Sequence, residues 1–94
     1  MNQNNKKRER LEVIFDILKN ISNHQNSIKP TPLLRKSNLS SSNFNEYYRE
    51  LVSKEFVKEI IDKKNRKYIT LTDKGFKFIE KYNIIQGLIK EFEL

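Results

Sequence analysis

The chain has 94 residues, and its 19 lysines and arginines outnumber its 12 aspartates and glutamates, which gives a net charge of +7. It has no cysteine and a single histidine, so disulfides, thiolate metal sites and paired-histidine zinc sites are excluded. A chain of this length forms one small domain. Its strongly positive net charge favours an anionic partner such as nucleic acid. No apolar run approaches the ~20 residues that a membrane span requires.

Residues 1–8 are polar and basic and show no apolar pattern, so we expect a flexible basic tail. From Glu9 to Ile21 the apolar residues recur at helical spacing and form a stripe wide enough to be buried on two sides. The stripe consists of Leu11, Val13, Ile14, Phe15, Ile17, Leu18 and Ile21. These positions predict a first helix, and residues 20–29, rich in Asn, Ser and Gln, predict a loop after it.

A short second helix is predicted after this loop. Thr31 is its expected N-cap, and Pro32 is expected at the first helical position, where a missing N–H does no harm. The helix ends at Ser37. Asn38 suits a left-handed backbone and Ser40 suits the cap of another helix, so we expect a tight turn between two helices.

The stretch from Ser41 to Ser53 predicts a third helix with one apolar and one polar face. The apolar face consists of Leu39, Phe44, Tyr48, Leu51 and Val52. The polar face consists of Ser41, Ser42, Asn45, Glu46 and Arg49. Each of these polar side chains can hydrogen-bond a base edge or a phosphate oxygen, which makes the third helix the candidate reading element.

Two strands with a basic tip between them follow the third helix. The strands are predicted at Phe56–Ile61 and Lys67–Leu71, and in the second one Ile69 and Leu71 face away from Tyr68 and Thr70. The tip and its flank offer candidate phosphate contacts at Lys63, Lys64, Asn65, Arg66 and Lys67. A solvated hairpin tip is the simpler alternative, but the net charge favours phosphate binding. Arg35 and Lys36 would add backbone contacts.

A last helix is predicted over residues 73–94, with Thr72 as its N-cap. Its apolar residues alternate at spacings of four and three, as in a coiled-coil seam. The predicted dimer interface consists of Phe78, Tyr82, Ile85, Leu88, Ile89 and Phe92. A helix packed entirely within its own monomer is the alternative.

The order helix, helix, turn, helix, strand, basic hairpin, strand, long helix is that of a winged helix-turn-helix. The predicted fold class is therefore mostly α with a small β-hairpin, continued by a long C-terminal helix. We divide the chain into a flexible basic tail (1–8), a winged helix-turn-helix DNA-binding domain (9–72) and a C-terminal dimerisation helix (73–94).

Several strings of the sequence resemble the archaeal ten-a type winged-helix DNA-binding proteins, over residues 9–92. They are Asn38-Leu39-Ser40, Phe44, Tyr47-Tyr48, Leu51, Phe56-Val57, Arg66-Lys67-Tyr68, Leu71-Thr72-Asp73-Lys74-Gly75, Phe78-Ile79 and Lys81-Tyr82. The resemblance implies a homodimer joined by an antiparallel coiled coil of C-terminal helices, and a role in chromatin organisation or transcriptional regulation. The chain departs from the pattern in its rather short last helix and in Glu46, which is acidic on the proposed DNA face.

We therefore predict sequence-tolerant or modestly specific binding of double-stranded DNA by a homodimeric regulator or chromatin protein. Arg49 would bond guanine or clamp a phosphate, Asn45 would pair with adenine, and Glu46 would accept from cytosine or hold Arg49 in place. Ser41 and Ser42 suit phosphate oxygens near the helix N-terminus.

The alternative function is a winged-helix protein-interaction module within a larger assembly, since an acidic protein would also satisfy the charge. An enzyme is not expected, because the sequence shows no phosphate-cradling glycine loop and no nucleophile–base grouping. We also expect no metal, no cofactor, no small-molecule substrate and no membrane partner. The expected location is cytoplasmic and nucleoid-associated.

Overall fold

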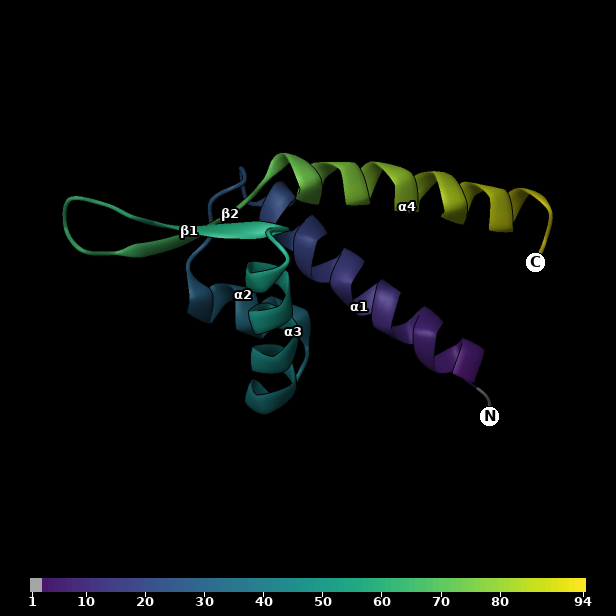
Figure 1. Cartoon of the computed structure of the whole chain (residues 1–94), viewed down its shortest axis with the longest axis horizontal. Coiled ribbons are helices and arrows are strands. Elements are labelled where there is room, and N and C mark those ends of the chain that lie inside the picture. Colours follow the sequence, from purple (N-terminus) through teal and green to yellow (C-terminus); the bar gives the residue numbers. More distant parts are fainter. Residues whose placement is uncertain (1–2) are drawn as a thin grey trace.

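The computed structural model describes the backbone of residues 3–94 and the side chains of residues 9–94. Its elements are α1 (Gln3–Asn23), α2 (Pro30–Ser37), α3 (Ser41–Ser53), β1 (Val57–Ile61), β2 (Lys67–Leu71) and α4 (Asp73–Glu91). The predicted fold class, four helices with a two-stranded hairpin and a long last helix, is confirmed (Figure 1). The hairpin and the C-terminal part of α4 project in opposite directions, so the molecule measures 49 × 25 × 21 Å.

Helix α1 is the central element of the core. Its residues Ile17, Leu18 and Ile21 are almost fully buried, and the helix contacts α2, β2 and α4. The other core residues are Ile14, Ile28, Leu33, Phe44, Leu51, Val57, Ile69 and Leu71. The two-sided burial predicted for α1 is therefore correct for its C-terminal half.

The N-terminal half of α1 differs from the prediction. The helix begins at Gln3 rather than Glu9, so the predicted tail overlaps with helical backbone, and Met1 and Asn2 lie outside the described residues. Its first residues are mostly Gln, Lys, Arg and Glu, which have good helix propensity, and extending a formed helix costs little. Leu11 is 42% exposed although it belongs to the predicted stripe, because this part of α1 extends beyond the core.

Helix α2 begins earlier than predicted, and its N-cap is Lys29 rather than Thr31. Pro30 takes the first helical position, because its ring fixes a helical φ and its missing N–H needs no partner there. The turn that follows is as predicted. Asn38 has a left-handed backbone with φ of 59°, and the Ser40 hydroxyl accepts a hydrogen bond from the backbone N–H of Asn43.

Helix α3 buries a narrower face than the sequence predicted. Phe44 and Leu51 are buried and Tyr48 is half-buried, with the Phe44 and Tyr48 rings stacked at 5.8 Å. Val52 is 37% exposed, so its assignment to the apolar face is wrong. Adjacent residues of a helix differ by about 100° in direction, and Val52 therefore points away from the core side of Leu51.

Strands β1 and β2 form an antiparallel hairpin in which Val57 pairs with Leu71 and Ile61 with Lys67. Beyond Val57 the whole of β1 is exposed, and the hairpin projects from the core as a wing (Figure 1). Thr70, expected to face away from the core, is only 7% exposed. The reason is that β2 contacts α1, α2 and α4, and Ile28 bridges to it at Ile69.

Helix α4 begins at the cap that the sequence predicted. The Thr72 hydroxyl accepts from the backbone N–H of Gly75 at 3.2 Å. The Tyr82 ring is buried and lies 4.8 Å from the Phe15 ring of α1 and 5.7 Å from the Phe78 ring. The helix then extends past the core.

Gly75 lies where α4 passes close to the end of β1, which provides a stability test. A Cβ atom there would lie 2.3 Å from the Phe56 carbonyl oxygen, whereas a Cβ at Gly87 meets nothing within 4 Å. We expect Gly75→Ala to lower the free energy of unfolding by about 2 kcal/mol. Gly87→Ala, the matched control, should raise it by roughly 0.5–1 kcal/mol, because alanine is the better helix former. Urea unfolding followed by circular dichroism at one protein concentration measures both, and equal effects would contradict this packing.

Candidate nucleic-acid interface

The exposed face of α3 brings together all five polar residues that the sequence singled out. Ser41, Ser42, Asn45, Glu46 and Arg49 are exposed and lie away from the buried Phe44 and Leu51. The Ser40 side chain caps this end of the helix, and the first-turn N–H groups and the positive end of the helix dipole lie beside Ser41 and Ser42. The face therefore offers hydroxyl, amide, carboxylate and guanidinium groups on one rigid element.

Arg49 pairs with none of the carboxylates of residues 9–94, Glu46 included. Glu46 thus does not hold the guanidinium in this structure, although the two residues stand three apart on the helix. An unpaired guanidinium keeps all its donors for a base edge or a phosphate.

A cluster of three charged side chains fastens α3 to α1. Glu50 accepts from Arg10 of α1 and, at 2.8 Å, from Lys54. These two cations, Arg10 foremost, lower the pKa of Glu50 from 4.5 to about 2. This cluster was not predicted from the sequence. The four-residue spacing of Glu50 and Lys54 was visible, but Arg10 lies 40 residues away, and only folding brings it close.

One hydrogen bond connects α3 to the wing. The Tyr48 hydroxyl donates to the Glu59 carboxylate of β1. Partial burial, together with this bond, raises the pKa of Tyr48. The bond thus connects α3 directly to the first strand of the wing.

The wing tip has less free charge than its sequence suggests. The Asp62 carboxylate accepts from the backbone N–H groups of Lys64 and Arg66, both at 2.9 Å, and from the Arg66 guanidinium at 2.8 Å. These bonds lower the pKa of Asp62 and raise that of Arg66. Asn65 closes the turn with a left-handed φ of 65°. Two of the wing cations are therefore offset, since Lys67 also lies 3.5 Å from the Glu59 carboxylate.

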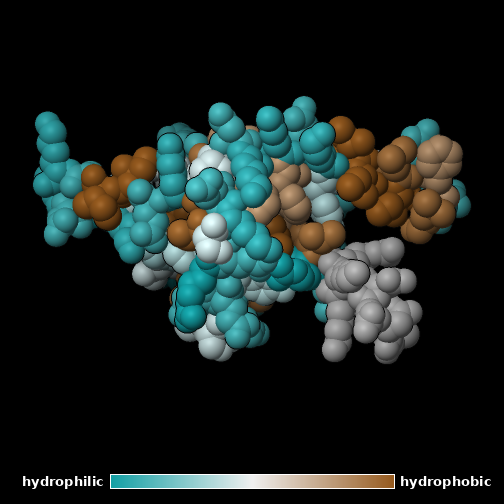
Figure 2. Space-filling model, in the orientation of Figure 1, coloured by the Kyte–Doolittle hydropathy of each residue, from teal (hydrophilic) through white to brown (hydrophobic). Residues whose placement is uncertain are grey.

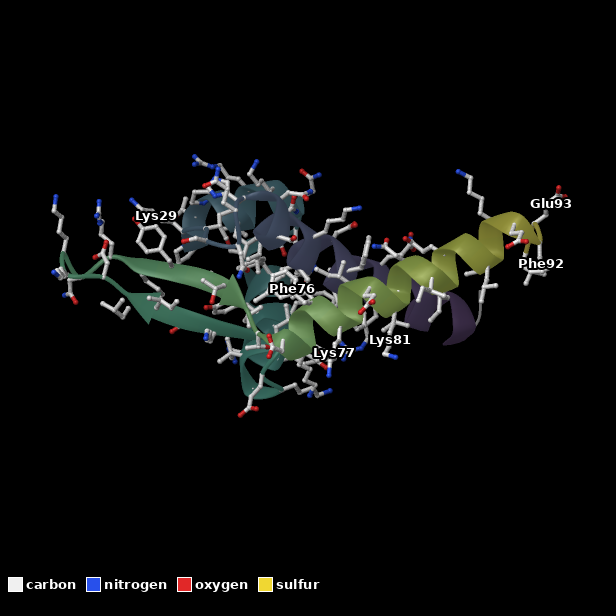
Figure 3. All side chains as sticks on the ribbon, turned by 90° about the horizontal axis from the view of Figure 1, so that it is seen from above. Lys29, Phe76, Lys77, Lys81, Phe92 and Glu93 are labelled. Atoms are coloured by element: carbon white, nitrogen blue, oxygen red, sulfur yellow. The ribbon has the colours of Figure 1, made fainter. Side chains whose placement is uncertain are left out.

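At the wing tip, Lys63 and Lys64 have no ion pair among the described side chains, and both are exposed. Arg35 and Lys36 are exposed in the last turn of α2, close in sequence to the start of α3. Lys29 was not among the predicted contact residues, but its ammonium lies 5.8 Å from the centre of the Tyr68 ring of β2 (Figure 3). Lys29 comes from a loop, where periodicity gives no signal.

Within the described part of the chain, no three His, Asp or Glu side chains come together as a metal site. The same residues contain no helix that is long and apolar enough to cross a membrane.

The family of winged helix-turn-helix proteins matches the chain over residues 7–90. This is most of its length, so the chain belongs to that family. No curated protein sequence matches it significantly.

Three solved structures share the fold. MepR, a transcription regulator of the Staphylococcus aureus multidrug efflux pump MepA, is 18% identical with a TM-score of 0.74, and the match covers 85% of this chain and 60% of MepR. Sso10a-2, a DNA-binding protein from Sulfolobus solfataricus, is 21% identical with a TM-score of 0.66, covering 88% and 86%. A MarR family transcriptional regulator from Silicibacter pomeroyi is 21% identical with a TM-score of 0.69, covering 98% and 60%. The chain thus spans about 60% of the two longer regulators.

The Glu50 cluster predicts a pH dependence of stability. Because folding depresses the pKa of Glu50, its stabilising effect is present above about pH 4.5 and is lost as the pH falls towards 2. We expect Glu50→Gln to lower the free energy of unfolding by about 1 kcal/mol at pH 7, since the pair is partly exposed. The difference from the wild type should disappear near pH 2.

Glu46→Gln is the matched control, with the same charge change one helical turn away and no ion pair among the described residues. Urea titrations from pH 7 to pH 2 provide the measurement. An equal loss of stability in both variants would show that net charge, rather than the Arg10 contact, is responsible.

Proposed function

We propose that the protein binds double-stranded DNA, with α3 in the major groove and the wing along the neighbouring phosphates. The observation that carries this proposal is the exposed polar face of α3 next to the wing, with the Tyr48–Glu59 hydrogen bond connecting the two elements. The net charge of +7 and the family membership agree with it. MepR and Sso10a-2 are described as a transcription regulator and a DNA-binding protein, and we infer a role in transcription regulation or chromatin organisation, of the archaeal ten-a type.

The residues of α3 divide into two groups by their place on the helix. Ser41 and Ser42, at its N-terminus, suit phosphate oxygens, because the helix dipole favours negative charge there. Asn45 and Arg49 lie further along, and their side chains match adenine and guanine edges. Glu46 lies between them and disfavours phosphate, so we assign it to a cytosine amino group. One arginine beside serines and a glutamate indicates modest rather than strict sequence preference.

The wing should act through the charge of Lys63 and Lys64. Each phosphate contact contributes about 0.9 to the slope of log K against log salt concentration. We therefore expect Lys63→Gln combined with Lys64→Gln to reduce this slope by roughly two, equally on all duplexes. Arg66→Gln should have a smaller effect, since Asp62 already offsets that charge. Fluorescence anisotropy with duplex DNA over a range of salt concentrations measures the slope.

Lys77→Gln combined with Lys81→Gln is the matched control. It removes the same charge from exposed positions of α4, away from the wing (Figure 3). An identical loss of slope in both double variants would indicate diffuse charge attraction and not a wing contact. No binding by the wild type would favour the alternative, a module that binds an acidic protein.

We also propose that the protein is a homodimer joined through the C-terminal part of α4. Ile84, Ile85, Leu88 and Phe92 are between 49% and 62% exposed, and Figure 2 shows the apolar surface that this end of the helix presents. Such a contiguous apolar surface is unusual on a monomer. Two of the residues predicted in the interface, Phe78 and Tyr82, pack against the core of their own protomer. The proposed interface therefore shifts towards Ile85, Leu88, Ile89 and Phe92.

Leu88→Asp tests the dimer. A buried, unpaired carboxylate in the interface should convert the dimer into a monomer, as measured by light scattering. Phe76→Asp is the control, because Phe76 is 43% exposed on another side of the same helix. A wild-type monomer, or equal dissociation of both variants, would contradict the proposed interface.

A further inference from the structure

Two neighbouring isoleucines of β1 are exposed on the wing, next to its charged tip. Ile60 is 44% and Ile61 53% exposed, although the buried part of the strand ends at Val57. Figure 2 shows this apolar surface on the wing, just behind the hydrophilic tip. Threonine would support the strand equally well and would suit water better, so the isoleucines call for a physical reason.

The two isoleucines lie on opposite faces of the hairpin, and only one of them has an apolar partner. Ile60 stands directly opposite Tyr68, an aromatic and β-branched pair of the kind that stabilises sheets. Ile61 stands opposite Lys67. The pairing therefore accounts for Ile60 and leaves Ile61 without an apolar partner across the strand.

Ile61 also lies on the face of the wing that is turned towards α3. Side chains alternate along a strand, so Ile61 shares a face with Val57 and Glu59. Val57 is in the core, and Glu59 accepts the hydrogen bond from Tyr48 of α3. Ile61 is thus an apolar group on the proposed DNA side, at the end of β1 and next to the tip that carries the unpaired Lys63 and Lys64.

An apolar side chain next to a cationic tip matches the DNA minor groove. Lysines at the minor groove neutralise the phosphates along its edges, whereas the walls of the groove are formed by sugars. An isoleucine inserted into the groove can separate two stacked base pairs and bend the duplex. Pyrimidine–purine steps such as TA deform most easily. A second copy of the chain would also cover apolar surface, but the flanking lysines would then repel one another.

We propose that Ile61 is a minor-groove wedge, which contacts sugars and base edges and gives the protein a preference for deformable steps. This inference rests on the proposed DNA binding and adds to it a residue that acts without charge. It also gives the wing a part in sequence preference, in addition to its phosphate contacts.

The test compares Ile61→Thr with Ile60→Thr, two identical changes at adjacent positions of the same strand. Affinity is measured by anisotropy on two duplexes of equal length, one with a central TA step and one with an A-tract, and bending by energy transfer between end labels. We expect Ile61→Thr to weaken binding to the TA duplex about fivefold and to reduce its bend, with the salt slope unchanged. Ile60→Thr should stay within about twofold of the wild type.

Three results would overturn the inference while leaving the proposed DNA binding in place. The first is that Ile61→Thr binds and bends the duplex as the wild type does, and the second is that Ile60→Thr has an equal effect. The third is that Ile61→Thr changes the molecular mass of the protein together with its binding, which would assign the apolar surface to contact with a second copy. Failure of the wild type to bind either duplex would instead refute the proposed function itself. Circular dichroism of both variants confirms that the comparison is between folded proteins.

Discussion

The fold depends on the burial of one helical stripe. Ile17, Leu18 and Ile21 of α1 are almost fully buried, and the helix contacts α2, β2 and α4. A 94-residue chain has little apolar surface to bury, so the fold depends strongly on the few side chains that this region buries. The wing and the end of α4 extend beyond this core, so their exposed apolar side chains can contact other molecules.

Polar contacts orient the surface that the core carries. Glu50, held by Arg10 and Lys54, joins α3 to α1, and Tyr48 joins α3 to the wing through Glu59. These bonds contribute little free energy, because they are partly exposed, and the buried Phe44, Leu51 and Val57 anchor α3 and β1 to the core. A polar contact also shapes the wing tip. Asp62 accepts from the backbone of the tip and offsets the charge of Arg66, whereas Lys63 and Lys64 remain unpaired.

Predictions from local sequence signals were correct where local physics decides the structure. The structure confirms the caps at Ser40 and Thr72, the left-handed Asn38 and the range of β2. Each of these features is set mainly by residues that are close together in the sequence. The predicted start of α2 was wrong, because two prolines near it give the same signal. Pro30 and Pro32 both suit a helix start, and the structure uses the first.

The sequence by itself determined the order of the elements, the polar face of α3 and the excess of positive charge, since periodicity and composition are properties of the chain. Tertiary structure alone decided which charges remain unpaired and which apolar residues remain exposed. Arg10 meets Glu50 across 40 residues, Tyr82 is buried against Phe15, and Ile61 is left uncovered on the wing. The physical reason is that pairing and burial depend on which distant segments become neighbours, and the packing of α1 determines that.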